Sequence, residues 1–260
     1  MAAVTAADNR VKAHHVSRLF HHLTRSEHPS LSRQPYTFLG QSNAVVWKPV
    51  PNSTLRHERL AYGTDPSTQI HFSFTTADGT APALVQLGTA PGTYSRNVSA
   101  AEAVTYTASD SCGKPSAWSF PGYFHHAAIS GLSPATRYYA RAVQGSAVGA
   151  ETSFMTGKVP SALSSIRALV FADMSISNGD GAVKTAARIA ERAGNSADPI
   201  DFALHVGDLS YGEGNVAVWE EWMDLIAPTC RAIPYHVSIG SECDHAYCVG
   251  IPLVIACCTA

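Results

Sequence analysis

The sequence predicts a chain of two parts that differ in class: a β-sandwich over residues 61–157 and the first part of an α/β domain over residues 166–247. This prediction rests on a change in the spacing of the apolar residues along the chain. Up to about residue 156, short alternating runs are broken by turn residues roughly every ten positions, as in antiparallel sandwiches. From Ile166 onward, apolar runs alternate with helical patterns in the order β-α-β-α-β, which is typical of a parallel sheet.

The sandwich strands follow from alternation between turn signals such as Asp78-Gly79, Pro91-Gly92 and Pro121-Gly122. The expected strands are 70–74, 83–87, 104–107, 124–129, 137–143 and 151–154. Tyr138 follows the turn Gly131-Leu132-Ser133-Pro134-Ala135-Thr136. This arrangement resembles the tyrosine corner of fibronectin type III sandwiches, so we expect the Tyr138 hydroxyl to bond an upstream backbone group.

The second part begins after a polar linker, residues 158–165. We expect parallel strands at 166–171, 202–206 and 235–239, the first of them buried on both faces. Two helices are expected between them. The first spans 182–193 with Val183, Ala186, Ala187 and Ala190 on one face, and the second spans 216–226 with Trp219, Met223 and Ile226 along one stripe.

The two ends of the chain have weaker signals. Residues 1–60 form a poorly defined segment, in which residues 10–25 are basic and amphipathic. That pattern is faintly similar to a transit peptide, but a surface helix explains it more simply. Two His pairs in the same stretch could bind a metal, although a solvated face fits better because no carboxylate or Cys accompanies them. Residues 248–260 form an apolar tail.

Composition excludes several classes of protein. The 260 residues contain 18 Lys and Arg against 20 Asp and Glu, a formal net charge of −2, which argues against a nucleic-acid binder. With 45% apolar and 15% charged residues, the chain is not of the disordered class. No apolar run reaches the roughly 18 residues of a membrane span. No secretory signal is visible, so the compartment is unknown.

Acidic residues follow the expected strands. Asp173 ends the first, Asp208 and then Tyr211 end the second, and Gly240-Ser241-Glu242 ends the third. A single Asp after a strand is usually a cap or turn former. Acids after successive parallel strands, however, converge at one sheet edge, and hard oxygen ligands held there suit a metal ion. His205, inside the second strand, is expected to be a hydrogen-bonded core residue rather than a ligand.

These residues resemble a known family, the purple acid phosphatases among the calcineurin-like metallophosphoesterases. Gly207-Asp208-Leu209-Ser210-Tyr211 matches the family's G-D-x-x-Y block, and Asp173-Met174-Ser175 is similar to its D-x-G block. In the sandwich, Cys112-Gly113-Lys114-Pro115 and Pro121-Gly122-Tyr123-Phe124-His125 resemble the C-G-x-P and P-G-Y-x-H stretches. The similarity covers roughly residues 60–245, in the family's domain order.

The resemblance implies an acid phosphatase with two metal ions, Fe(III) and a second metal that is Zn, Mn or Fe. Asp173 and Tyr211 would bind the ferric ion and Asp208 would bridge the pair. Small phosphate monoesters would be the substrates, with no nucleic acid and no membrane span. Family members often dimerise and are usually secreted or vacuolar.

The chain departs from the family at its third block. Ser241 stands at the position of the Asn ligand, the His of G-N-H is absent, and the two later His blocks have no counterpart. No intact catalytic residue can therefore be assigned. This pattern predicts weak or absent activity and a truncated chain, from a retained intron or a frameshift. The alternatives are a non-catalytic binding module with a partial phosphatase sheet, or a fragment from an error in gene prediction.

Overall fold

A computed structural model describes residues 55–108, 120–161, 164–176, 179, 181–211 and 216–238. All of them belong to one unit, residues 45–260. Within these ranges no helix is long and apolar enough to cross a bilayer.

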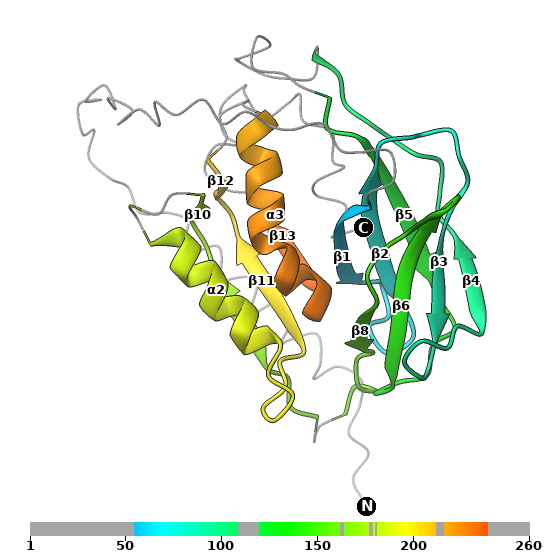
Figure 1. The fold of residues 1–260 in the computed structure, drawn as a ribbon. Helices are drawn as coiled ribbons and strands as arrows, with labels where there is room; N and C mark the ends of the chain where they lie inside the picture. Colours follow the sequence, from blue (N-terminus) through cyan, green and yellow to red (C-terminus); the bar gives the residue numbers. More distant parts are fainter. Residues whose placement is uncertain are drawn as a thin grey trace, which may run out of the picture. The chain divides into compact units, whose positions relative to one another are not determined.

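Two antiparallel sheets form the sandwich (Figure 1). The first has the order β1 (Arg56–Tyr62), β2 (Ile70–Thr76) and β5 (Tyr123–Ile129). The second has the order β4 (Arg96–Ser99), β3 (Ala83–Gly88), β6 (Arg137–Gln144) and β7 (Ala147–Val148), and β8 (Thr152–Met155) also pairs with β6. Alternate side chains from both sheets, among them Phe72, Val85 and Phe154, form the shared core. The predicted sandwich is confirmed.

One predicted strand is wrong. Residues 104–107 form a single bridge, in which Val104 and Phe124 exchange backbone hydrogen bonds. Pairing stops there because Gly122, with φ of +97°, turns the partner chain out of register, and the Thr105 hydroxyl donates to the Gly122 carbonyl instead. Three sandwich strands were not predicted, among them the two-residue β7. β1 straddles the expected boundary at residue 61, and β4 contains no apolar alternation.

The tyrosine corner is confirmed. The backbone N–H of Ser133 donates a 2.9 Å hydrogen bond to the Tyr138 hydroxyl, which lies five residues further along the chain. Ala135, at the tip of the loop, has a positive φ of 48°. The Tyr138 ring stacks on Phe154, so the corner fixes the loop to the sandwich core.

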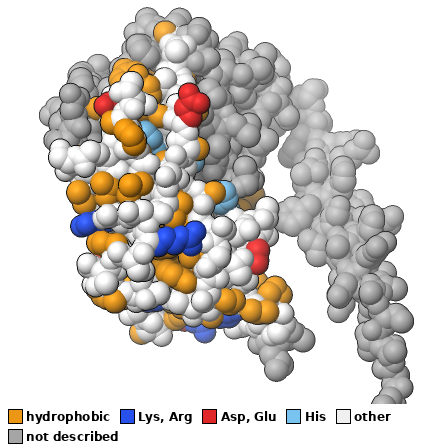
Figure 2. Space-filling model, turned by 90° about the vertical axis from the view of Figure 1, so that its right-hand side faces the viewer, with side chains coloured by type: hydrophobic (Ala, Val, Ile, Leu, Met, Phe, Trp, Pro, Cys, Tyr) orange, Lys and Arg blue, Asp and Glu red, His pale blue; other side chains and the backbone are white. Residues whose placement is uncertain are grey.

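Figure 2 views the molecule from the side that carries β3, β4 and β6 in Figure 1. Basic side chains there form small groups separated by apolar and uncharged polar atoms. On the outer surface of this sheet, Arg141 lies over the ring of Tyr94, which bonds Glu151. Basic side chains on this face are therefore scattered rather than gathered into one basic field.

The second part is a parallel sheet with two helices. Its strands are β9 (Ala168–Phe171), β11 (Phe202–Val206) and β13 (Tyr235–Ser238), in the spatial order β13-β11-β9. The helices are α2 (Ala182–Ala193) and α3 (Val216–Ala232). Because successive crossovers of one hand add strands in one direction, both helices cover the same face of the sheet (Figure 1). The predicted parallel order is confirmed.

Three details differ from the prediction. β9 is not buried on both faces, since Val170 is 64% exposed and lies on the face opposite the helices. Of the predicted α2 face, Ala186 is buried, Val183 and Ala190 are half-buried and Ala187 is exposed, and the helix also buries Ala182 and Ala193. Helix α3 continues through Pro228 to Ala232, six residues beyond the expected end.

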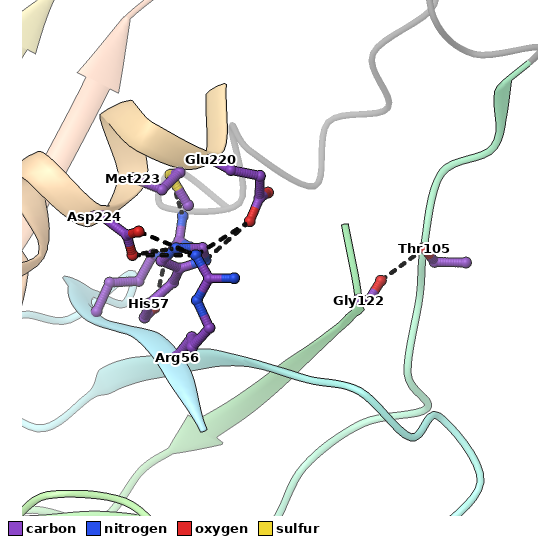
Figure 3. A network of polar contacts seen from close by, with 8 residues as sticks. Arg56, His57, Thr105, Gly122, Glu220, Met223 and Asp224 are labelled. Carbon is purple, nitrogen blue, oxygen red and sulfur yellow. Dashed lines mark hydrogen bonds and ion pairs between the residues drawn. The ribbon is translucent and has the colours of Figure 1, made fainter. Parts of the chain in front are cut away.

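A polar network joins β1 to α3 (Figure 3). Nε2 of His57 lies 2.9 Å from Asp224, and Arg56 forms an ion pair with the same carboxylate at 3.1 Å. Arg56 also lies 3.7 Å from the buried carboxylate of Glu220. His57 is 4% exposed and has a left-handed φ of 54°. The network therefore ties the sandwich to the helix that covers the parallel sheet.

Candidate metal centre

Two acidic loops meet at the carboxyl edge of the parallel sheet. Asp173 follows β9 and Asp208 follows β11, and two short strands, β10 (Met174–Ser175) and β12 (Leu209–Ser210), pair in parallel beyond them. The backbone N–H of Asp173 donates to the Gly207 carbonyl at 3.3 Å, and that of Met174 donates to the Asp208 carbonyl at 3.2 Å. The backbone itself thus holds the two acidic positions next to each other.

Tyr211 completes the group. Its hydroxyl donates to Oδ1 of Asp173 at 2.9 Å and lies 3.4 Å from Oδ2 of Asp208. Asp173 and Tyr211 are exposed, and Asp208 is half-buried. The three side chains that the sequence singles out therefore come together, with the Tyr211 phenol in contact with both carboxylates at a place that solvent can reach.

The backbone at this point is strained. Six non-glycine residues have positive φ in the part of the chain that the structure describes, and four of them lie here: Asp173, Asp208, Ser210 and Tyr211, at 51° to 62°. A side chain in this conformation costs of order 1 kcal/mol or more, and such residues gather at functional sites. Asp tolerates the conformation through its short polar side chain, whereas Tyr does not. The strain marks the loop as more than a simple turn.

His205 lies directly beneath the loop. It is fully buried, and its Nδ1 is 2.8 Å from the hydroxyl of Tyr235 on β13. Burial lowers the pKa of His205 to about 4, although the charges of Asp173 and Asp208 act in the opposite direction. Its prediction as a hydrogen-bonded core residue is confirmed. Tyr235 was expected only as part of a strand, and its polar tip facing a buried His is the signal that sequence reasoning missed.

The remaining predicted position is not placed. Ser241 lies outside the described residues, as do the rest of the third block and the tail. Among the residues described, no group of three or more His, Cys, Asp and Glu side chains could hold a metal ion. Among the described residues, the oxygens brought together at this edge are those of the two carboxylates and the Tyr211 phenol. Three oxygen donors of this kind fit one hard cation.

Comparison with known proteins agrees with the fold. Residues 56–156 match the family model described as "Purple acid Phosphatase, N-terminal domain". The chain is 28% identical over 169 residues to "Probable inactive purple acid phosphatase 27" of Arabidopsis thaliana, covering 58% of this chain and 27% of that protein. It is 26% identical over 158 residues to "Probable inactive purple acid phosphatase 24" of the same plant, covering 55% and 26%.

A solved structure, the purple acid phosphatase PPD1 from yellow lupin (Lupinus luteus) seeds, superposes with a TM-score of 0.65 at 23% identity. The match covers 73% of this chain and 36% of the lupin chain. The chain therefore spans about a quarter of the length of the curated relatives and about a third of the lupin structure. Its sandwich matches the N-terminal domain of the purple acid phosphatase family, and the chain is similar to members of that family.

Proposed function

We propose that this chain binds a metal ion and inorganic phosphate or small phosphate monoesters at the Asp173–Asp208–Tyr211 edge, and turns phosphate esters over slowly or not at all. The observation that supports this proposal is the 2.9 Å contact between Tyr211 and Asp173 within a strained loop. A neutral hydrogen-bonded turn would not need this strain. Binding of one ion by all three oxygens would offset the energetic cost of the strain.

The proposed ion is ferric. Asp173 and Tyr211 would hold it, and Asp208 would supply a further oxygen, because carboxylate and phenolate are hard donors. When bound, such an ion polarises a phosphoryl oxygen and lowers the pKa of bound water. The two loops position the ligands, because the backbone hydrogen bonds between them set the spacing of the carboxylates before any ion binds. The exposed phenol of Tyr211 leaves the point open to a phosphate from solvent.

Low turnover follows from the residues at the third strand end. Ser241 replaces an amide ligand with a shorter hydroxyl, and no His follows it directly to transfer a proton. A positioned proton donor typically contributes about 100- to 10,000-fold in rate. The two Arabidopsis relatives that carry "probable inactive" in their names are in keeping with this expectation.

A second candidate is a non-catalytic binding module, in which the sandwich is the functional part and the sheet edge binds no metal. The names of the same relatives favour it equally. The two candidates differ in one property, metal-dependent binding of phosphate.

The test combines phosphate binding with phosphate release. The purified 260-residue chain is supplied with iron and zinc at pH 5, and both phosphate affinity and hydrolysis of an aryl phosphate are measured. The proposal expects metal-dependent phosphate binding with little or no release, and loss of binding in Asp208→Asn. Asn keeps the left-handed backbone of that position and removes only the charge. Phosphate binding that depends neither on metal nor on Asp208 would favour the binding module. Rapid release would contradict the expected low turnover.

A further inference from the structure

The imidazole of His205 touches every strand of the parallel sheet. Its ring centroid lies 4.9 Å from that of Phe171 on β9, and its Nδ1 lies 2.8 Å from the Tyr235 hydroxyl on β13. Helix α3 covers the ring from above, with the Trp222 centroid 5.9 Å away. His205 is therefore packed between all three strands and the covering helix, at the end of the sheet that carries the acidic loops.

Phe171 and His205 lie only a few residues before the two acidic loops. Phe171 precedes Asp173 by two residues, and His205 precedes Asp208 by three. A shift of the His205 ring would move Phe171 and Val206, and with them the starting points of both loops. The two carboxylates also act on the ring, since their charges favour its protonated form.

The second ring nitrogen has no partner among the described residues. Nε2 of His205 is buried and neither donates a hydrogen bond to any of them nor accepts one. A buried polar atom left unpaired costs about 1–3 kcal/mol, so a Phe or Leu at this position would be the more stable choice for a purely structural core. The presence of a His there needs another reason.

We propose that His205 is a positioning residue for the metal ligands Asp173 and Asp208: its ring, packed against Phe171 and Tyr235, fixes the ends of β9 and β11, and its buried Nε2–H is the donor that the ion-bound edge would use. The inference rests on the proposed function. Outer hydrogen-bond partners of metal-binding carboxylates orient them, and their loss typically weakens metal binding by about 10- to 100-fold.

The Tyr235 hydroxyl determines the tautomer in this account. When it donates to Nδ1, the proton of the neutral ring must sit on Nε2. The low pKa of His205 keeps the ring neutral at physiological pH, so the donor persists. This can be observed in the metal-free chain, because two-bond 1H–15N couplings distinguish the two tautomers. The Nε2–H form is expected, and the Nδ1–H form would overturn the donor role.

The sandwich contains a matched control. His126 has the same pattern: its Nδ1 lies 2.8 Å from the Ser73 hydroxyl, its Nε2 is buried without a partner among the described residues, and burial lowers its pKa to about 4. It lies on β5, which belongs to the sandwich sheet. His126→Phe therefore changes the same chemistry in a place that carries no candidate ligand.

Titration calorimetry with Mn²⁺ alone tests the inference on the full chain. His205→Phe keeps an aromatic ring but removes both ring nitrogens, and it should weaken Mn²⁺ binding by about 10- to 100-fold while the chain still melts cooperatively. His205→Gln places an amide N–H near the former Nε2 and should restore part of the affinity. His126→Phe should bind Mn²⁺ as the unmodified chain does.

Equal Mn²⁺ affinity in His205→Phe and the unmodified chain would overturn the positioning role and leave the proposed function standing. An unmodified chain that binds no Mn²⁺ would overturn both. If His205→Phe does not fold, Tyr235→Phe serves in its place, because it removes only the hydroxyl that fixes the tautomer. A loss of more than about two-fold is then expected, and unchanged affinity would overturn the inference.

Discussion

The Tyr211 hydroxyl donates a 2.9 Å hydrogen bond to the carboxylate of Asp173, a residue 38 positions earlier in the chain. The contact joins the loops that follow β9 and β11, and it occurs where both loops have left-handed backbone. A phenol and a carboxylate held at this distance are two donors that a hard cation could take together.

Removing the Tyr211 hydroxyl tests its role as a donor. Tyr211→Phe should change the free energy of unfolding by no more than about 1 kcal/mol, because the ring is partly exposed and the hydrogen bond faces solvent. The iron-loaded chain should lose its visible absorption band, since a ferric phenolate can no longer form. Tyr139→Phe, on β6 of the sandwich, is the control and should keep the band. A band that survives in Tyr211→Phe would show that Tyr211 is not the ligand.

The tyrosine corner predicts a stability effect in the sandwich. Tyr138→Phe leaves the Ser133 N–H without its acceptor and should lower the free energy of unfolding by about 1–3 kcal/mol. Tyr139→Phe again provides a neighbouring control that leaves the corner intact. Chemical denaturation measures both variants, and equal stability of the two would mean that the corner contributes nothing.

The boundary of the sandwich can be tested with two fragments. Residues 55–157 contain β1, whereas residues 66–157 lack it, which exposes the edge of β2 and removes Leu60 from the core. The longer fragment should unfold in one cooperative transition and the shorter one should not. Cooperative melting of the shorter fragment would show that β1 belongs with α3 rather than with the sandwich.

Acid should destabilise the folded chain. Burial lowers the pKa of His57 to about 4, against an opposing hydrogen bond to Asp224, with Arg56 and Arg59 adding to the decrease. The unfolded chain therefore binds a proton at His57 near pH 6.5 and the folded chain only near pH 4. Stability is full above pH 6.5 and falls as the pH drops through this window, by roughly 3 kcal/mol for His57 at the lower end.

His126 and His205 act in the same direction, because burial lowers both of their pKa values to about 4. The pKa of Asp224 is also lowered: burial opposes the change, but the hydrogen bond to His57 and the nearby positive charges outweigh it. Its contribution is therefore lost only below this pH window. Denaturation of the unmodified chain and of His57→Gln at pH 7 and pH 4.5 measures the effect. The variant should lose less stability on acidification, and equal losses would exclude His57 as a source.

Sequence reasoning reached most of the fold because alternation and helical periodicity report burial. It missed β1, β4 and the two-residue β7 because they lack apolar alternation. β1 buries the charged side chains Glu58 and Arg59, and β4 pairs with β3 at a sheet edge where Arg96 and Asn97 are exposed. Sequence reasoning also overestimated the burial of β9, since a run of apolar residues does not reveal which face the helices cover. The site residues could be named because three oxygen-bearing side chains follow successive strands.

The side-chain contacts beneath the site could not be predicted from the sequence in the same way. Nothing in the order of residues indicates that the His205 ring reaches Tyr235, 30 positions away, or that His57 meets Asp224 across the junction between the sandwich and α3. Both contacts depend on how separate elements pack. The left-handed backbone at Asp208 and Tyr211 could not be predicted either, because residue type alone does not indicate a positive φ.

Iron content tests the central claim most directly. The 260-residue chain is loaded with Fe(III), freed of excess metal and analysed for iron per chain, beside Asp208→Asn and, as a control, Asp78→Asn in a sandwich turn. The account predicts one iron for the unmodified chain and the control, and loss of iron from Asp208→Asn. Equal iron in all three proteins, or none in the unmodified chain, would contradict the claim that Asp173, Asp208 and Tyr211 form a metal site.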